Sequence, residues 1–182
     1  LVISNGTLDA NAKDIYLAGS WYNTGTLTHD DNTVTLDGAN QAIYRSSTFY
    51  NLKKRYGNVL SFEAAASQTV EGIFVAKGFG DASKILLVSL TPGAYWYINI
   101  SSNTYVVNYF DVRDSHNLGS SIVASLKNNY VNCIGWPMDE GEITSGNWSI
   151  DTTSTPDFND SFSSFDSDGD CIFYNYSVDC QV

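Results

Sequence analysis

Three aspartates near the C-terminus form the sharpest candidate for chemistry in this sequence. Asp166, Asp168 and Asp170 stand at alternate positions of the run Asp-Ser-Asp-Gly-Asp. Carboxylates at this spacing around a glycine-containing turn can converge on one hard cation, as in calcium-binding loops. The pattern is incomplete, because Cys171 stands where such a loop has its turn-forming glycine and Ser177 where it has a bidentate glutamate. Calcium binding and a solvated acidic turn are the two interpretations, and calcium is the candidate cofactor.

The charge of the chain is distributed unevenly. All nine Lys and Arg residues lie at or before Lys127, whereas the 55 residues that follow carry ten of the 20 carboxylates. The net charge of −11 therefore belongs almost wholly to the C-terminal part, where the carboxylates repel each other unless they bind cations or a basic surface. The acidic chain and its single short basic cluster, Lys53-Lys54-Arg55, argue against nucleic acid as a partner. We interpret this cluster as a solvated turn between strands.

The cysteines and the Asn-x-Ser/Thr sequons point weakly to a secreted protein. Cys171 and Cys180 flank the run Ile-Phe-Tyr-Asn-Tyr and are candidates for a disulfide that closes a short hairpin. Pairing through Cys133 and free thiols are the alternatives. The candidate glycosylation sites are Asn5, Asn99, Asn147, Asn159 and Asn175.

The best candidate for enzymatic chemistry is the segment from Asp111 to His116. Alternation along a strand would place Asp111 and Arg113 on one face, as an acidic-sugar lyase or hydrolase would require, but a surface ion pair explains them equally well. We expect His116 and His29 to be separate turn residues, and no Ser-His-Asp or Cys-His arrangement is recognisable. We therefore assign no catalytic residues and expect a protein that is not an enzyme, with a glycan lyase or hydrolase as the enzymatic alternative.

Two aromatic runs, Tyr95-Trp96-Tyr97 and Trp21-Tyr22, could stack against sugar rings. In a strand, however, Tyr95 and Tyr97 share one face and Trp96 occupies the other. Part of each run should therefore belong to the core. Carbohydrate binding through exposed aromatic residues is an alternative function.

The elements that would position these residues are short strands. Runs rich in Val, Ile, Thr, Tyr and Phe are separated by Asn, Asp and Gly, and no long window has helical periodicity. No stretch approaches the ~20 apolar residues of a spanning helix. Gly6-Thr-Leu-Asp recurs 19 residues later as Gly25-Thr-Leu-Thr, and Thr35-Leu-Asp-Gly38 echoes it. A period of about 20 residues indicates a parallel β-solenoid with Asn and Gly at its corners, and the alternative is an antiparallel β-sandwich.

The chain also resembles a known family over residues 1–136. The succession Gly25-Thr-Leu-Thr, Thr33-Val-Thr-Leu-Asp-Gly38, Gln41-Ala-Ile and Ser47-Thr-Phe-Tyr-Asn-Leu52 is similar to repeats of bacterial cell-surface proteins with right-handed parallel β-helices, the filamentous-haemagglutinin-like domains. The ending Asn132-Cys-Ile-Gly-Trp136 resembles the final coils of such segments. The resemblance implies an adhesive or structural surface role and supplies no catalytic residues.

These observations predict an all-β extracellular or cell-surface protein. We expect a right-handed parallel β-solenoid over 1–136 and an irregular, acidic, cysteine-containing segment over 137–182. Because Leu1-Val-Ile is already strand-like, the first coil should be covered by a longer chain or by another copy. The expected function is a self-associating structural or adhesive component of a surface layer, sheath or filament. Its expected partners are further copies of the chain, or carbohydrate in the alternative, and it should not span a membrane.

Overall fold

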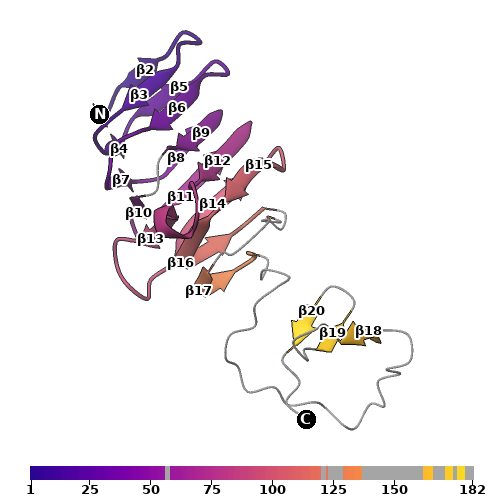
Figure 1. The fold of residues 1–182 in the computed structure, drawn as a ribbon. Helices are drawn as coiled ribbons and strands as arrows, with labels where there is room; N and C mark the ends of the chain where they lie inside the picture. The colour runs from indigo at the N-terminus through magenta and orange to yellow at the C-terminus, as the bar shows by residue number, and fades with distance from the viewer. Residues whose placement is uncertain are drawn as a thin grey trace. The chain divides into compact units, whose positions relative to one another are not determined.

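The computed structural model shows an all-β protein whose parallel strands stack as a β-solenoid (Figure 1). The structure describes residues 1–55, 58–119, 122 and 129–136, and the strand backbones 162–165, 171–173 and 176–178. The chain forms two compact units, Leu1–Met138 and Asp139–Val182. The predicted parallel solenoid is confirmed, and the antiparallel sandwich does not occur among the described residues of the first unit. The handedness of the coil stays a prediction.

Each of the first five coils, or rungs, of the solenoid contributes one strand to each of three faces. The first face contains β1 (Val2–Ile3), β4 (Trp21–Asn23), β7 (Gln41–Tyr44), β10 (Val59–Phe62), β13 (Ile85–Ser89), β16 (Phe110–Asn117) and β17 (Asn129–Ile134). The second face contains β2 (Thr7–Asp9), β5 (Thr26–Thr28), β8 (Ser47–Phe49), β11 (Ser67–Val70) and β14 (Trp96–Ile100). The third face contains β3 (Ile15–Leu17), β6 (Thr33–Leu36), β9 (Asn51–Lys54), β12 (Ile73–Lys77) and β15 (Thr104–Asn108).

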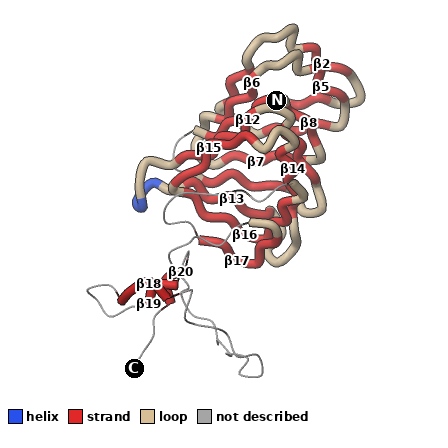
Figure 2. The backbone as a smooth tube through the Cα atoms, turned by 90° about the vertical axis from the view of Figure 1, so that its right-hand side faces the viewer, coloured by secondary structure: helices blue, strands red, loops and turns tan. Residues whose placement is uncertain are grey.

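The long strand β16 joins the first two faces. Its beginning pairs with β13, with Phe110 opposite Ile85, and its end pairs with β14, with Ser115 opposite Trp96. The strand turns the corner at Asp114, whose φ is 53°. A short 3₁₀ helix, η1 (Asp81–Ser83), lies in the loop between β12 and β13 and projects from the stacked rungs in Figure 2.

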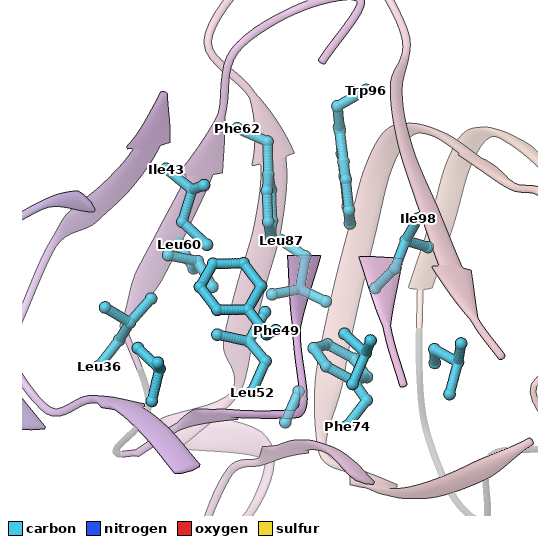
Figure 3. Close-up of a cluster of buried hydrophobic side chains, with 14 of the residues drawn as sticks. Leu36, Ile43, Phe49, Leu52, Leu60, Phe62, Phe74, Leu87, Trp96 and Ile98 are labelled. Atoms are coloured by element: carbon cyan, nitrogen blue, oxygen red, sulfur yellow. The ribbon is translucent and has the colours of Figure 1, made fainter. Parts of the chain in front are cut away.

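The core forms because parallel rungs in register place equivalent side chains on top of one another. On the third face Val34, Leu52 and Phe74 follow one another in register and are fully buried. Between β10 and β14 the rings of Phe62 and Trp96 stack with centroids 3.7 Å apart and planes 6° apart (Figure 3). Such a pair contributes roughly 0.5–1.5 kcal/mol beyond its buried area.

The corners are made largely by Asn, as predicted, and by Asp in the left-handed region, whereas among the described glycines only Gly80, Gly93 and Gly135 have a positive φ. Asn5, Asn11, Asp30 and Asn103 have φ of 54°, 47°, 45° and 55°. These side chains tolerate that conformation better than most others do. The corner chemistry therefore bends the chain between faces at low cost.

The sequence Asn132-Cys-Ile-Gly-Trp136 closes the described part of the solenoid. Trp136 is 7% exposed, and its Nε1 donates to Ser115 Oγ over 3.0 Å. Gly135 has a φ of 72°, and a side chain there would overlap the carbonyl oxygen of Asn117. Glycine before tryptophan thus allows the ring to fold back against the preceding rung.

In the second unit the structure describes three antiparallel strands. They are β18 (Phe162–Phe165), β19 (Cys171–Phe173) and β20 (Tyr176–Val178). β19 pairs with both neighbours, with Cys171 opposite Phe165 on one side and Val178 on the other. The Cys171–Val178 segment therefore contains the hairpin that the sequence suggested.

Candidate functional site

The outer surface of the third face combines apolar and basic side chains. In β12, Phe74 and Ala76 point into the core, so Ile73, Val75 and Lys77 point outward. Val75 lies in register between Lys53 of β9 and Val106 of β15, and these side chains also point outward. Ile73 is 40% and Val106 48% exposed. We call Lys53, Ile73, Val75, Lys77 and Val106 the apolar-basic stripe.

The five strands of the third face contain no Asp or Glu among their residues, all of which the structure describes. Two lysines in a chain of net charge −11 therefore stand on a sheet without carboxylates of its own. This surface therefore combines two positive charges with valines and an isoleucine that expose apolar area to water.

The interpretation of Lys53-Lys54-Arg55 as a solvated turn is wrong for Lys53 and Lys54, which are strand residues of β9. Lys54 lies in β9 between Leu36 and Ala76 in an inward-facing column and is 1% exposed. Strand alternation causes this arrangement, because the burial of Leu52 turns Lys53 outward and Lys54 inward.

Lys54 is held inside the solenoid by three acceptors at one corner. Its Nζ donates to Gly38 O over 2.6 Å, to Ala39 O over 3.2 Å and to Gln41 Oε1 over 2.8 Å. The Gln41 amide is fixed in turn, because its Nε2 donates to two carbonyl oxygens of the preceding rung. Desolvation lowers the pKa of Lys54 to about 8, and the charge of Asp37 opposes this shift. The buried amine therefore ties adjacent corners together.

The aromatic runs are divided between core and surface, as alternation predicted. Trp21 and Trp96 are fully buried, so neither indole can stack against a ligand. Tyr97 points outward beside His116, with ring centroids 5.7 Å apart. Tyr95 lies 6.4 Å from the same histidine, and its hydroxyl donates to Asn132 Oδ1 over 2.8 Å. A stacking platform built on these runs would rest on the tyrosines alone.

The segment proposed for enzymatic chemistry does place Asp111 and Arg113 on one outward face, because Val112 between them is buried. Asp111 Oδ1 lies 3.1 Å from Lys84 Nζ, an ion pair in which both side chains are roughly one-quarter exposed. His116 is a strand residue of β16, so the prediction of a turn residue is wrong for it. His29 does lie at a corner, where its Nε2 is 3.4 Å from Glu71 Oε2. The two histidines belong to different rungs and are not brought together.

Most predicted metal, disulfide and glycosylation sites lie outside the described residues. These are Asp166, Asp168, Asp170, Cys180, Asn147, Asn159 and Asn175. For Cys171 the structure describes the backbone only. Asn5 is exposed at a corner, and Asn99 points outward from β14 and is partly buried. Cys133 is a free thiol whose pKa burial raises to about 11. Within the described part of the chain, no three His, Cys, Asp or Glu side chains are grouped to hold a metal.

The described residues also contain no helix with the length and apolarity that crossing a bilayer requires. Comparisons with protein-family models, curated proteins and solved structures found no match to this chain. The apolar-basic stripe was missed by the sequence reasoning. Its signal was present in the alternating runs Asn51-Leu-Lys-Lys54 and Ile73-Phe-Val-Ala-Lys77, once their register was known.

Proposed function

We propose that this chain is a structural and adhesive segment of an extracellular or cell-surface solenoid that associates with further copies of itself. The observation that carries the proposal is the apolar-basic stripe on the third face. Its valines and lysines lie on adjacent hydrogen-bonded strands, so they form one continuous surface. The resemblance of residues 1–136 to filamentous-haemagglutinin-like repeats supports a displayed, non-catalytic role.

Charge complementarity supports a second copy as the partner. The ten carboxylates that follow Lys127 have no Lys or Arg among them, whereas the stripe carries Lys53 and Lys77. Lys54, being buried, contributes no surface charge to this contact. The acidic C-terminal segment of one copy would thus meet the third face of the next, with apolar contact from Val75 and Val106. Opposite charges would orient the copies, and removal of the valines from water would stabilise them.

Sedimentation velocity over a range of protein concentrations, with electron microscopy of the same samples, tests the proposal. The double variant Val75→Thr, Val106→Thr keeps β-branched side chains but replaces a methyl by a hydroxyl at each position. We expect each substitution to cost about 1 kcal/mol of association free energy, so that the double variant needs at least roughly tenfold more protein to associate. Association of the wild type should also weaken as salt rises.

Val131→Thr is the matched control. Val131 lies on β17 of another face and is 47% exposed, against 48% for Val106. This variant should associate like the wild type. A wild-type chain that stays monomeric at all concentrations, both with calcium and with EDTA, would contradict the proposal. Equal effects of the control and the double variant would show that the third face is not the interface.

A further inference from the structure

The hydrogen-bonded ladder of the second face is interrupted between its second and third rungs. Strands β2 and β5 form a separate two-stranded sheet, whereas β8, β11 and β14 belong to the large sheet. β5 and β8 nevertheless remain neighbours in the stack. A groove with a volume of about 310 Å³ opens at this interruption.

The contacts on either side of the groove tie each of the interrupted rungs to its other neighbour. On one side, Thr26 N donates to Gly6 O over 2.8 Å, and a side chain at Gly25 would overlap the same carbonyl oxygen. Glycine at 25 therefore lets β5 approach β2 closely. On the other side, Ser67 N donates to Ser46 Oγ over 3.0 Å and ties the rung of β11 to the rung of β8.

Hydroxyl groups dominate the lining of the groove. They belong to Thr26, Ser46, Ser47, Thr48, Ser67 and Thr69. No charged residue lines it within the described part of the chain. Thr48 and Thr69 are in register on adjacent strands, so their side chains project about 4.8 Å apart. Neither hydroxyl makes a hydrogen bond within the described residues, which leaves both available to a ligand.

The floor of the groove is polar and has a fixed geometry. Ser47 is 7% exposed, and its Oγ accepts from Trp21 Nε1 over 3.0 Å and from Asn23 Nδ2 over 3.3 Å. With both acceptor positions used, the hydroxyl hydrogen of Ser47 remains for donation. Gln68, in register with Ser47, is fully buried in the interior and does not line the groove.

We propose that this groove binds a single residue of a neutral carbohydrate. A sugar ring presents several hydroxyls that donate and accept, which matches a lining of hydroxyls and amides. A charged ligand would lose hydration without gaining an opposite charge. The volume lies at the lower end of the range for small-molecule sites and fits one ring rather than a long chain. An added peptide strand is disfavoured, because β5 and β8 are already neighbours.

This inference goes beyond the proposed self-association, since the groove lies on the second face and the apolar-basic stripe on the third. The sugar-binding proposal and the self-association proposal can therefore fail independently of each other. The groove also differs from the tyrosine cluster around His116, because none of its lining residues is aromatic.

Saturation-transfer NMR on the full 182-residue chain tests the proposal. The probes are glucose, galactose, mannose and N-acetylglucosamine, with glucuronate and glucosamine as charged counterparts. We expect transfer to at least one neutral sugar and weaker transfer to the charged ones. The double variant Thr48→Val, Thr69→Val removes two hydroxyls while keeping β-branched shape. Each lost hydrogen bond weakens binding roughly two- to tenfold, so the double variant should bind at least about fourfold more weakly.

Thr7→Val is the matched control, because Thr7 is exposed on β2 of the same face but does not line the groove. It should bind sugar like the wild type, and circular dichroism should show that both variants remain folded. The proposal is overturned if no neutral sugar receives saturation, or if the charged sugars bind equally well. It is also overturned if the double variant retains full binding. If the double variant retains full sugar binding and Tyr97→Leu abolishes it, the sugar binds at the tyrosine cluster instead.

Discussion

Replacement of the buried Lys54 by methionine provides the most direct test of how the solenoid corners are held. Methionine has a similar length and no charge, so the column between Leu36 and Ala76 stays filled. Three acceptors, however, lose their donor: the carbonyl oxygens of Gly38 and Ala39 and the amide oxygen of Gln41. Each unsatisfied buried group costs about 1–3 kcal/mol, which is partly offset by relief from burying the ammonium.

We therefore expect Lys54→Met to lower the free energy of unfolding by roughly 2–4 kcal/mol at pH 7. Lys53→Met is the control, because the neighbouring lysine points outward from the same strand. A surface substitution of this kind usually changes stability by less than about 0.5 kcal/mol. Urea titration followed by the fluorescence of the buried tryptophans measures both variants.

The difference in unfolding free energy between the wild type and Lys54→Met should depend on pH, and this dependence tests the cause of the pKa shift of Lys54. Desolvation lowers the pKa of Lys54 to about 8 in the folded chain. Below that pH the amine is charged in both states, and the cost of burying it is present in full. As pH rises through 8 the folded chain loses this proton first, so its stability should increase relative to Lys54→Met. With a pKa of about 10.4 for this lysine in the unfolded chain, the wild type should gain about 2 kcal/mol of unfolding free energy relative to Lys54→Met between pH 7 and 9.5.

The comparison with Lys54→Met removes the titration of other groups, because these are present in both proteins. A difference in unfolding free energy that stays constant from pH 7 to 9.5 would refute the desolvation argument. It would mean that the three acceptors keep the ammonium charged. A variant as stable as the wild type at pH 7 would refute the claim that these acceptors depend on Lys54.

Three further predictions concern the core, the thiol and a surface ion pair. Trp96→Ala should lower the free energy of unfolding by about 3–5 kcal/mol, and the outward-facing Tyr97→Ala by clearly less, in urea titrations. Cys133 should react with iodoacetamide at pH 7.5 only after unfolding, as followed by mass spectrometry, because burial raises its pKa to about 11; rapid labelling of the native chain would contradict this. Lys84→Gln, which breaks the pair with Asp111, should cost under about 1 kcal/mol, and a larger loss would indicate a structural role for the pair.

The register of the solenoid shows how far repeated residues can predict a fold. Gly6-Thr-Leu-Asp and Gly25-Thr-Leu-Thr do stack, with Thr7 opposite Thr26 and Leu8 opposite Leu27. The third echo, Thr35-Leu-Asp-Gly38, lies instead on another face, because Thr35 pairs with Tyr16 and Lys53. Later rungs are longer: Phe74 of β12 pairs with Tyr105 of β15, 31 residues further on. Loops inserted at corners change the period without changing the stacking, so a fixed period identifies only the early rungs.

The candidate surfaces were less predictable than the fold. Alternation correctly divided Tyr95-Trp96-Tyr97 between surface and core, since it depends on strand geometry alone. The groove beside Thr48 and Thr69 could not be foreseen, because it arises where two neighbouring strands fail to pair. The expectation for Lys54 failed for a related reason. Its burial depends on carbonyl oxygens from the preceding rung that happen to satisfy the amine.

The sequence by itself determined the strand-rich character, the turn residues and the separation of basic and acidic parts, because each follows from local composition. Tertiary structure decided which strands stack, and therefore which side chains share a surface. The stripe of Lys53, Val75 and Val106 unites residues that are 22 and 31 positions apart and become neighbours through inter-rung pairing. Such contacts depend on register and on the length of every intervening loop, which local patterns do not encode.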